Sequence, residues 1–219
     1  MIAHSNEERL ALAFGRRSNR ASFSLLLELD KSLGRALQHA SAPLAAQVRL
    51  AWWRDQIAAD RISQGASPVL AGLAHIFADH EDARAACARM IDGWDVLLAE
   101  DILSDDAILR FARDRGGSLF LLASIAAQEK GRGCIEDAGA LWALADFARH
   151  CSEPAIAARA LALGRPLLGS ARSLPRALRP FAILAYFAER DVLRGPDKLL
   201  PLGSPWRIAQ AWAVLLGLA

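Results

Sequence analysis

Apolar residues recur at intervals of three and four along most of the chain, which is the spacing that places side chains on one face of an α-helix. Short polar, proline or glycine stretches interrupt this pattern. It predicts helices at residues 21–39, 43–62, 68–79, 82–99, 105–128, 135–150, 176–193 and 205–216, and a weaker one at 154–163. Because no linker is long enough to divide the chain, we expect one all-α domain, a helical bundle spanning residues 1–219.

Two features inside this pattern refine the expected helices. Ser104, followed by Asp105 and Asp106, is a natural N-cap with two carboxylates near the positive end of a helix. Gly116 and Gly117 lie inside the segment 105–128, where each glycine weakens a helix by about 1 kcal/mol relative to alanine. We therefore expect a kink or a close helix–helix approach at this pair.

Composition supports helices and narrows the class of protein. The 53% hydrophobic fraction comes mostly from Ala and Leu, and only 7% of the 219 residues are aromatic, a mix that favours helices over sheets. The 26 basic and 24 acidic residues are scattered, which argues against a nucleic-acid partner. No apolar run approaches the roughly 20 residues of a membrane-spanning helix. We expect a cytoplasmic protein whose apolar C-terminal end can rest on a partner or on the inner membrane.

The three cysteines and the histidines carry no recognisable catalytic pattern. The cysteines form no C-x-x-C pair, which indicates a reducing compartment. No H-E-x-x-H, G-x-S-x-G or phosphate-binding glycine loop is present, so hydrolase and nucleotide-binding chemistry are unsupported. Asp92 and Asp95 lie one helical turn apart and can share a cation, but no second pair of carboxylates on another helix accompanies them, so we expect an ordinary polar face.

The stretch "QVRLAWWRDQIAADR" (residues 47–61) places two tryptophans between arginines in a predicted helix. Trp53 lies on the apolar stripe of that helix, and Trp52 lies about 100° further round. One interpretation is ordinary packing, with the arginine heads in water. The other is the wall of an apolar pocket in which an arginine faces an anion; its candidate residues are Arg49, Trp52, Trp53, Arg54 and Asp92.

The segment "RLAWWRDQI", together with the later "MIDGWDVLLAEDILSDDAILRFARDRGGSLFLLASIA", resembles the squalene/phytoene synthase family over roughly residues 21–195. The resemblance implies a bundle of the isoprenoid synthase type. Active members join two prenyl diphosphates, and two aspartate-rich motifs on facing helices hold the Mg²⁺ ions that neutralise the diphosphate leaving group.

This chain departs from both aspartate motifs. An ungapped comparison puts Gly34, Arg35 and Gln38 at the first set of aspartate positions, and His150 and Pro154 at the second. The resemblance is therefore closest to the degenerate branch of the family, whose mitochondrial members assist assembly of respiratory complex I. It implies a pseudoenzyme without a cofactor that binds a protein partner, such as a respiratory-chain component, and can retain an isoprenoid ligand.

An active enzyme is the alternative that the same resemblance leaves open. It is a Mg²⁺-dependent prenyltransferase in which the surviving acids form an unconventional metal site, namely Asp30, Asp92, Asp95 and Glu153.

Overall fold

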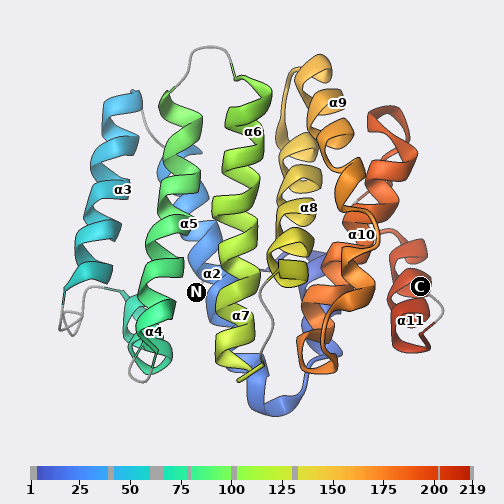
Figure 1. Cartoon of the computed structure of the whole chain (residues 1–219), viewed down its shortest axis with the longest axis horizontal. Coiled ribbons are helices and arrows are strands. Elements are labelled where there is room, and N and C mark those ends of the chain that lie inside the picture. The colour runs from blue at the N-terminus through green and yellow to red at the C-terminus, as the bar shows by residue number, and fades with distance from the viewer. Residues whose placement is uncertain are drawn as a thin grey trace.

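A computed structural model describes residues 4–38, 42–59, 67–77, 80–99, 103–129, 133–201 and 203–217 of the chain. Helices contain most of these residues, and none of the described residues lies in a strand. The helices stand side by side, with α3 at one edge of the molecule and α11 at the other (Figure 1). The prediction of an all-α protein is confirmed.

The helices follow one another with short connections. They are α1 (Asn6–Ala13), α2 (Arg17–Gln38), α3 (Pro43–Ala58), α4 (Pro68–Phe77), α5 (Glu81–Ala99), α6 (Asp105–Phe111), η1 (Ala112–Gly117), α7 (Ser118–Ala126), α8 (Gly133–His150), α9 (Pro154–Leu163), α10 (Arg179–Arg194) and α11 (Pro205–Leu215). Short 3₁₀ turns η2 (Arg165–Leu167), η3 (Ser170–Ser173), η4 (Arg176–Leu178) and η5 (Pro196–Lys198) connect the later helices. None of the described helices has both the length and the apolar character needed to cross a bilayer.

Most predicted helices are present, and two differences have a physical reason. Helix α1 was not predicted; it is eight residues long and begins with a capping box between Ser5 and Glu8, a local signal that apolar periodicity does not contain. Helix α10 begins at Arg179 rather than at residue 176, because Pro180 is tolerated in a first turn but not further inside a helix. The predicted helix ends at residues 39, 62 and 79 lie outside the described residues.

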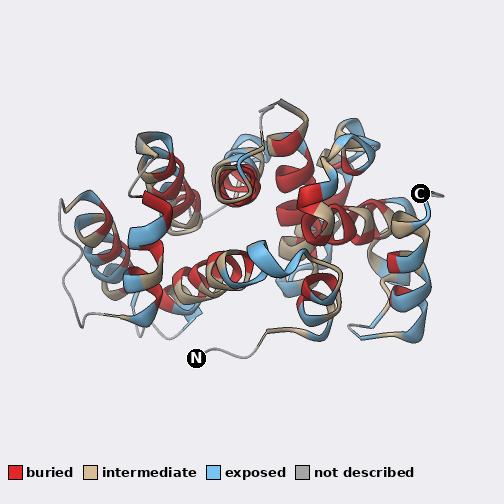
Figure 2. Ribbon diagram, turned by 90° about the horizontal axis from the view of Figure 1, so that it is seen from below, coloured by how far each residue is buried: buried red, intermediate tan, exposed pale blue. Residues whose placement is uncertain are grey.

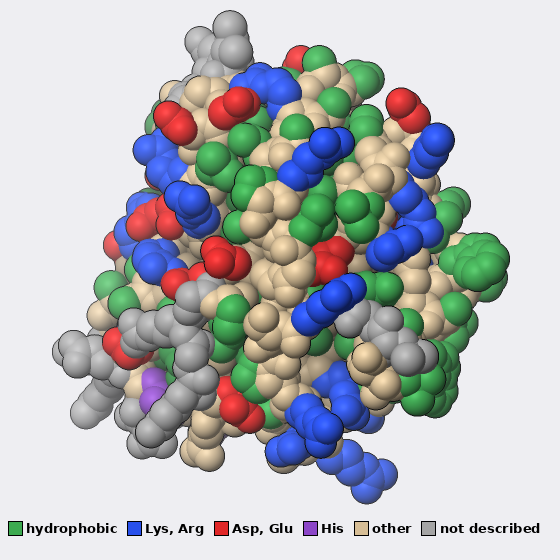
Figure 3. All heavy atoms as spheres, turned by 45° about the vertical axis from the view of Figure 1, so that its right-hand side comes forward, with side chains coloured by type: hydrophobic (Ala, Val, Ile, Leu, Met, Phe, Trp, Pro, Cys, Tyr) green, Lys and Arg blue, Asp and Glu red, His purple; other side chains and the backbone are tan. Residues whose placement is uncertain are grey.

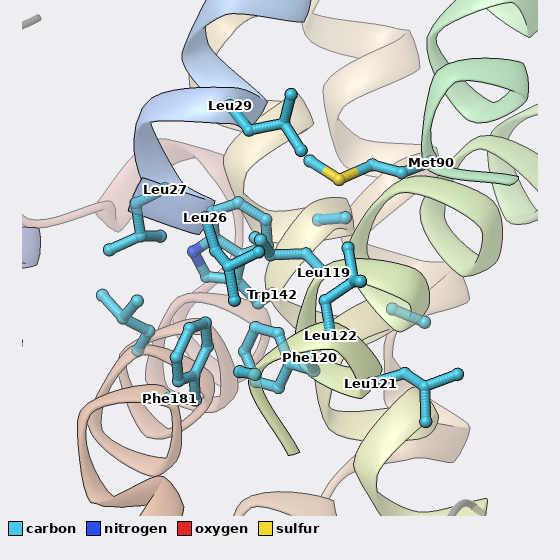
Figure 4. Packing of buried hydrophobic residues seen from close by; sticks show 14 of the residues in the cluster. Leu26, Leu27, Leu29, Met90, Leu119, Phe120, Leu121, Leu122, Trp142 and Phe181 are labelled. Atoms are coloured by element: carbon cyan, nitrogen blue, oxygen red, sulfur yellow. The ribbon is translucent and has the colours of Figure 1, made fainter. Parts of the chain in front are cut away.

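The buried apolar side chains meet between the helices. Phe120 of α7, Phe181 of α10 and Trp142 of α8 point toward one another beside Leu26 of α2 (Figure 4). The rings of Phe120 and Phe181 lie 4.9 Å apart in an edge-to-face arrangement. Buried residues occupy the inward faces of the helices, and exposed residues occupy the outer faces (Figure 2). This core fixes α2, α7, α8 and α10 around a common centre.

Helices α6 and α7 are joined without a break in helical structure by the π-helical segment η1. Here Gly116 packs directly on Gly139 of α8: a Cβ atom added at Gly116 would lie 2.1 Å from the Gly139 carbonyl oxygen. Gly93 of α5 packs on the other side, where an added Cβ would lie 2.6 Å from the backbone nitrogen of Arg115. The close approach predicted at the glycine pair is confirmed, and it brings α5, η1 and α8 together.

Candidate functional site

A cavity of about 480 Å³ lies beside the centre of the bundle. Its walls come from α2, α5, α6, η1, α8 and α10, and α1 contributes Glu7 and Glu8. Much of the surface is apolar, with the side chains of Leu37, Trp94, Leu97, Phe111, Trp142 and Leu184. Cavities of roughly 300–1,000 Å³ with apolar walls and a few polar groups are typical of small-molecule sites.

Arg115 is the central polar residue of this cavity, and only 4% of it is exposed. Its Nε and Nη2 atoms each donate a 2.8 Å hydrogen bond to Asp30 of α2, so the pair is bidentate. Its Nη2 also lies 2.7 Å from Oδ2 of Asp146 on α8. One guanidinium therefore links carboxylates from two different helices that line the cavity, α2 and α8.

Three aromatic rings surround the same guanidinium. Its central carbon lies 4.3 Å from the ring centre of Trp94, 4.8 Å from that of Trp142 and 5.4 Å from that of Phe111. Trp94 also donates an Nε1–H hydrogen bond of 3.3 Å to Asp30. Each ring within about 6 Å adds a cation–π attraction, so the arginine is held by both charge and aromatic contacts.

The electrostatics of this cluster keep Arg115 charged. Burial alone would lower its pKa, but the negative charges of Asp30 and Asp146 and their hydrogen bonds outweigh burial and raise the pKa above its ordinary value. The guanidinium therefore stays protonated and positively charged.

The local backbone explains how Arg115 reaches the cavity. It lies in η1, whose π-helical turns change the helix register, and π-helical turns occur frequently at functional sites. The neighbouring Gly116 and Gly117 permit the contact with α8 described above. On the opposite wall, Gly34 of α2 leaves room for the ring of Trp94, since an added Cβ would lie 3.0 Å from that ring.

A second buried network borders the cavity where α8, α10 and α11 meet. Asp191 of α10 accepts hydrogen bonds of 2.6 and 2.9 Å from Arg149 and of 2.8 and 2.9 Å from Arg207. Arg207 is fully buried, and its Nε also lies 2.8 Å from a carboxylate oxygen of Glu7. Burial raises the pKa of Glu7, an effect that the nearby arginines Arg207 and Arg149 partly offset.

The cavity wall carries a third set of charged contacts. Lys31 pairs with Glu8, and His4 lies 3.5 Å from the same carboxylate. His150 lies 3.4 Å from Asp146. Each of these contacts joins residues that line the cavity or lie next to it.

The pocket residues predicted around the tryptophan pair lie elsewhere. Arg49, Trp52, Trp53, Arg54 and Asp92 are on α3 and α5, and none of them lines the central cavity. Trp53 is buried and Trp52 is 41% exposed, with their rings 5.2 Å apart. Arg54 pairs with Asp92 at 2.6 Å on the surface, and Arg49 donates to the backbone carbonyl of Ala36. This arrangement agrees with the packing interpretation of the pair.

The four acids of the alternative metal site are dispersed. Asp30 lines the cavity but is bonded to Arg115, whereas Asp92 and Asp95 lie at the surface near Arg54. Glu153 is exposed at the beginning of α9. Within the described ranges, no group of three or more His, Cys, Asp or Glu side chains is arranged to hold a metal ion.

Sequence reasoning missed the residues that form the cavity's polar centre. Asp146 lies within the apolar run "LWALADF", and an acid on an otherwise buried helix needs a partner. That signal could have indicated an ion pair at Asp146 but not its partner, because Arg115 is 31 residues away along the chain (146 − 115). Among the residues aligned with the family's aspartates, Gly34, Arg35, Gln38 and His150 line the cavity and Pro154 does not.

Comparison with known proteins adds no identification. No family model, no curated protein and no solved structure matches this chain. The geometry of the site alone defines its chemistry: it is a largely apolar cavity in which the carboxylates of Asp30 and Asp146 already contact the guanidinium of Arg115.

Proposed function

We propose that this chain is a non-catalytic protein of the squalene/phytoene synthase type, with an isoprenoid synthase-like bundle that has lost prenyl transfer and acts as an accessory or assembly protein. Its central cavity serves as the site for an isoprenoid-like lipid. The observation that carries this proposal is the bonding of Arg115 to both Asp30 and Asp146.

The physical reason is the electrostatics of ionising a prenyl diphosphate. That reaction needs cations that bind the departing diphosphate, and carboxylates facing one another across the cavity would hold such metal ions. In this chain Asp30 and Asp146 bind the guanidinium of Arg115 instead. Its two hydrogen bonds to Asp30 and its 2.7 Å contact with Asp146 direct the cation toward the protein rather than toward a substrate. The cluster is thus suited to support the bundle and poorly suited to accept a leaving group.

Exposed apolar side chains support the accessory role. On α11 and at its C-cap, four apolar side chains are about half exposed or more, namely Trp206, Ile208, Trp212 and Leu216. On α3, Leu44, Val48 and Trp52 are exposed along one face. Hydrophobic side chains gather along the right edge of the molecular face in Figure 3. Grouped apolar residues on a surface are typical of contact sites.

The test of the proposal is pyrophosphate release. The purified chain is incubated with farnesyl and geranylgeranyl diphosphate and Mg²⁺, with an active prenyl synthase as the positive control in the same buffer. We expect no release above the protein-free blank. Mg²⁺-dependent turnover by this chain above the blank would overturn the proposal and support the Mg²⁺-dependent prenyltransferase instead.

The assembly role is tested separately in cells. Deleting the gene is expected to reduce the amount of assembled respiratory complex I, measured on native gels, and the wild-type gene is expected to restore it. Normal complex I in the deletion strain would contradict this part of the proposal.

A further inference from the structure

The charged side chains on the cavity wall balance one another. Among the residues that the structure describes, the wall carries five carboxylates and four cations, and Arg207 lies directly behind it as a fifth cation. The carboxylates belong to Glu7, Glu8, Asp30, Asp146 and Asp191, and the cations on the wall to Lys31, Arg35, Arg115 and Arg149. Counting each carboxylate as negative and each Lys or Arg side chain as positive, the formal charges of this set cancel (five negative, five positive).

The balance arises from specific contacts rather than from chance composition. Arg115 is bonded to Asp30 and lies against Asp146, and Asp191 lies between Arg149 and Arg207. Lys31 pairs with Glu8. The cations deepest in the wall are therefore already engaged with carboxylates.

A diphosphate group entering this space would meet an unfavourable environment. It would lose its hydration, and to gain a buried counter-ion it would have to displace Asp30 from Arg115 or Asp191 from Arg149. Breaking a buried pair leaves an uncompensated charge, so the exchange gains little. An uncharged head group needs no such exchange.

The rest of the wall suits an apolar chain. Trp94, Phe111 and Trp142 present aromatic surface, and Leu37, Leu97 and Leu184 present aliphatic surface. We infer that the cavity binds an uncharged single-chain lipid, of the prenyl alcohol kind, and discriminates against the corresponding diphosphate. This inference rests on the proposed role of the cavity as a ligand site and adds the charge of the ligand.

Binding of a matched pair of probes tests the inference. Farnesol and farnesyl diphosphate have the same chain and differ only in the head group. Both are titrated into the full chain in EDTA, and complexes are counted by native mass spectrometry. We expect one farnesol per chain and binding of the diphosphate that is weaker by about tenfold or more, since one unpaired buried charge corresponds to at least about that factor.

Two variants link the binding to this cavity. Leu97→Trp fills part of the space from a half-buried position on α5 and is expected to abolish farnesol binding, with a helical circular dichroism spectrum showing that it folds. Glu8→Gln leaves the wall with one excess positive charge and retains a residue type that forms a capping box with Ser5. It should strengthen diphosphate binding about fivefold and leave farnesol binding unchanged.

The matched control for the charge change is Glu136→Gln. Glu136 makes a 2.7 Å ion pair with Arg89 and does not line the cavity, so this variant should alter neither affinity. Equal or tighter binding of the diphosphate to the wild type would overturn the inference, as would absence of farnesol binding or farnesol binding that survives Leu97→Trp. These outcomes differ from pyrophosphate release, which would overturn the proposed function.

Discussion

Replacing Asp30 by Asn should destabilise the protein more than any other single loss of a carboxylate from the Arg115 cluster. The substitution preserves the shape of the side chain but removes the charge that accepts both 2.8 Å hydrogen bonds. The two side chains are only 4% and 6% exposed, so water cannot replace the lost carboxylate. Removing one partner of a buried ion pair costs about 3–5 kcal/mol.

The expected cost lies at the lower end of this range because Asp146 still balances Arg115. We expect the free energy of unfolding to fall by about 3 kcal/mol, which lowers the melting temperature by roughly 6–12 °C for a chain of this size. Asp146→Asn should cost only about 1 kcal/mol, since 27% of the Asp146 side chain is exposed and water can solvate the change.

A double substitution separates the charge from the packing. Asp30→Leu combined with Arg115→Met replaces the buried pair by apolar side chains, and such replacements are often close to neutral. The double variant should therefore be more stable than Asp30→Asn alone. Urea unfolding followed by circular dichroism measures all three variants. A cost below about 1 kcal/mol for Asp30→Asn, equal to that of Asp146→Asn, would refute the reasoning.

Two further predictions concern close packing and thiol chemistry. Gly116→Ala should lower the free energy of unfolding in urea by about 3 kcal/mol or more, because its Cβ would lie 2.1 Å from a backbone oxygen. Gly117→Ala is the control: its Cβ would have its nearest neighbour at 3.3 Å, so it should cost less than about 1 kcal/mol. Equal costs for the two variants would contradict the close approach at Gly116. Burial raises the pKa of the Cys87 thiol to about 12, so at pH 8 this thiol should not react with iodoacetamide in the native protein. The reagent should alkylate Cys134 and Cys151 instead, and peptide mass spectrometry measures the labelling of all three cysteines. Labelling of Cys87 at the rate of the other two would contradict its burial.

The helices could be predicted from the sequence because their signals are local. The spacing of apolar residues and the prolines at positions 43, 68, 154 and 205 indicated where helices lie and where several of them begin. The short helix α1 was missed because it buries only Glu8, Ala11 and Leu12 and so has little apolar period.

The cavity could not be predicted in the same way because its polar residues come from distant segments. Asp30 and Arg115 are 85 residues apart, and each looks ordinary among its own neighbours. Trp52 and Trp53 drew attention because they are adjacent, yet the tryptophans that line the cavity, Trp94 and Trp142, are isolated along the chain. The adjacent tryptophans pack against the bundle, whereas the cavity forms only where distant helices meet, which local sequence does not show.

The cation that balances Asp30 and Asp146 is a permanent part of the protein, because it belongs to the Arg115 side chain. A bound metal ion follows mass action, so its contribution to stability changes with the free ion concentration and is lost to a chelator. Arg115 is part of the chain, and its raised pKa means that it does not lose its proton either. The link between α2 and α8 therefore has the same strength in cells that are rich or poor in divalent ions.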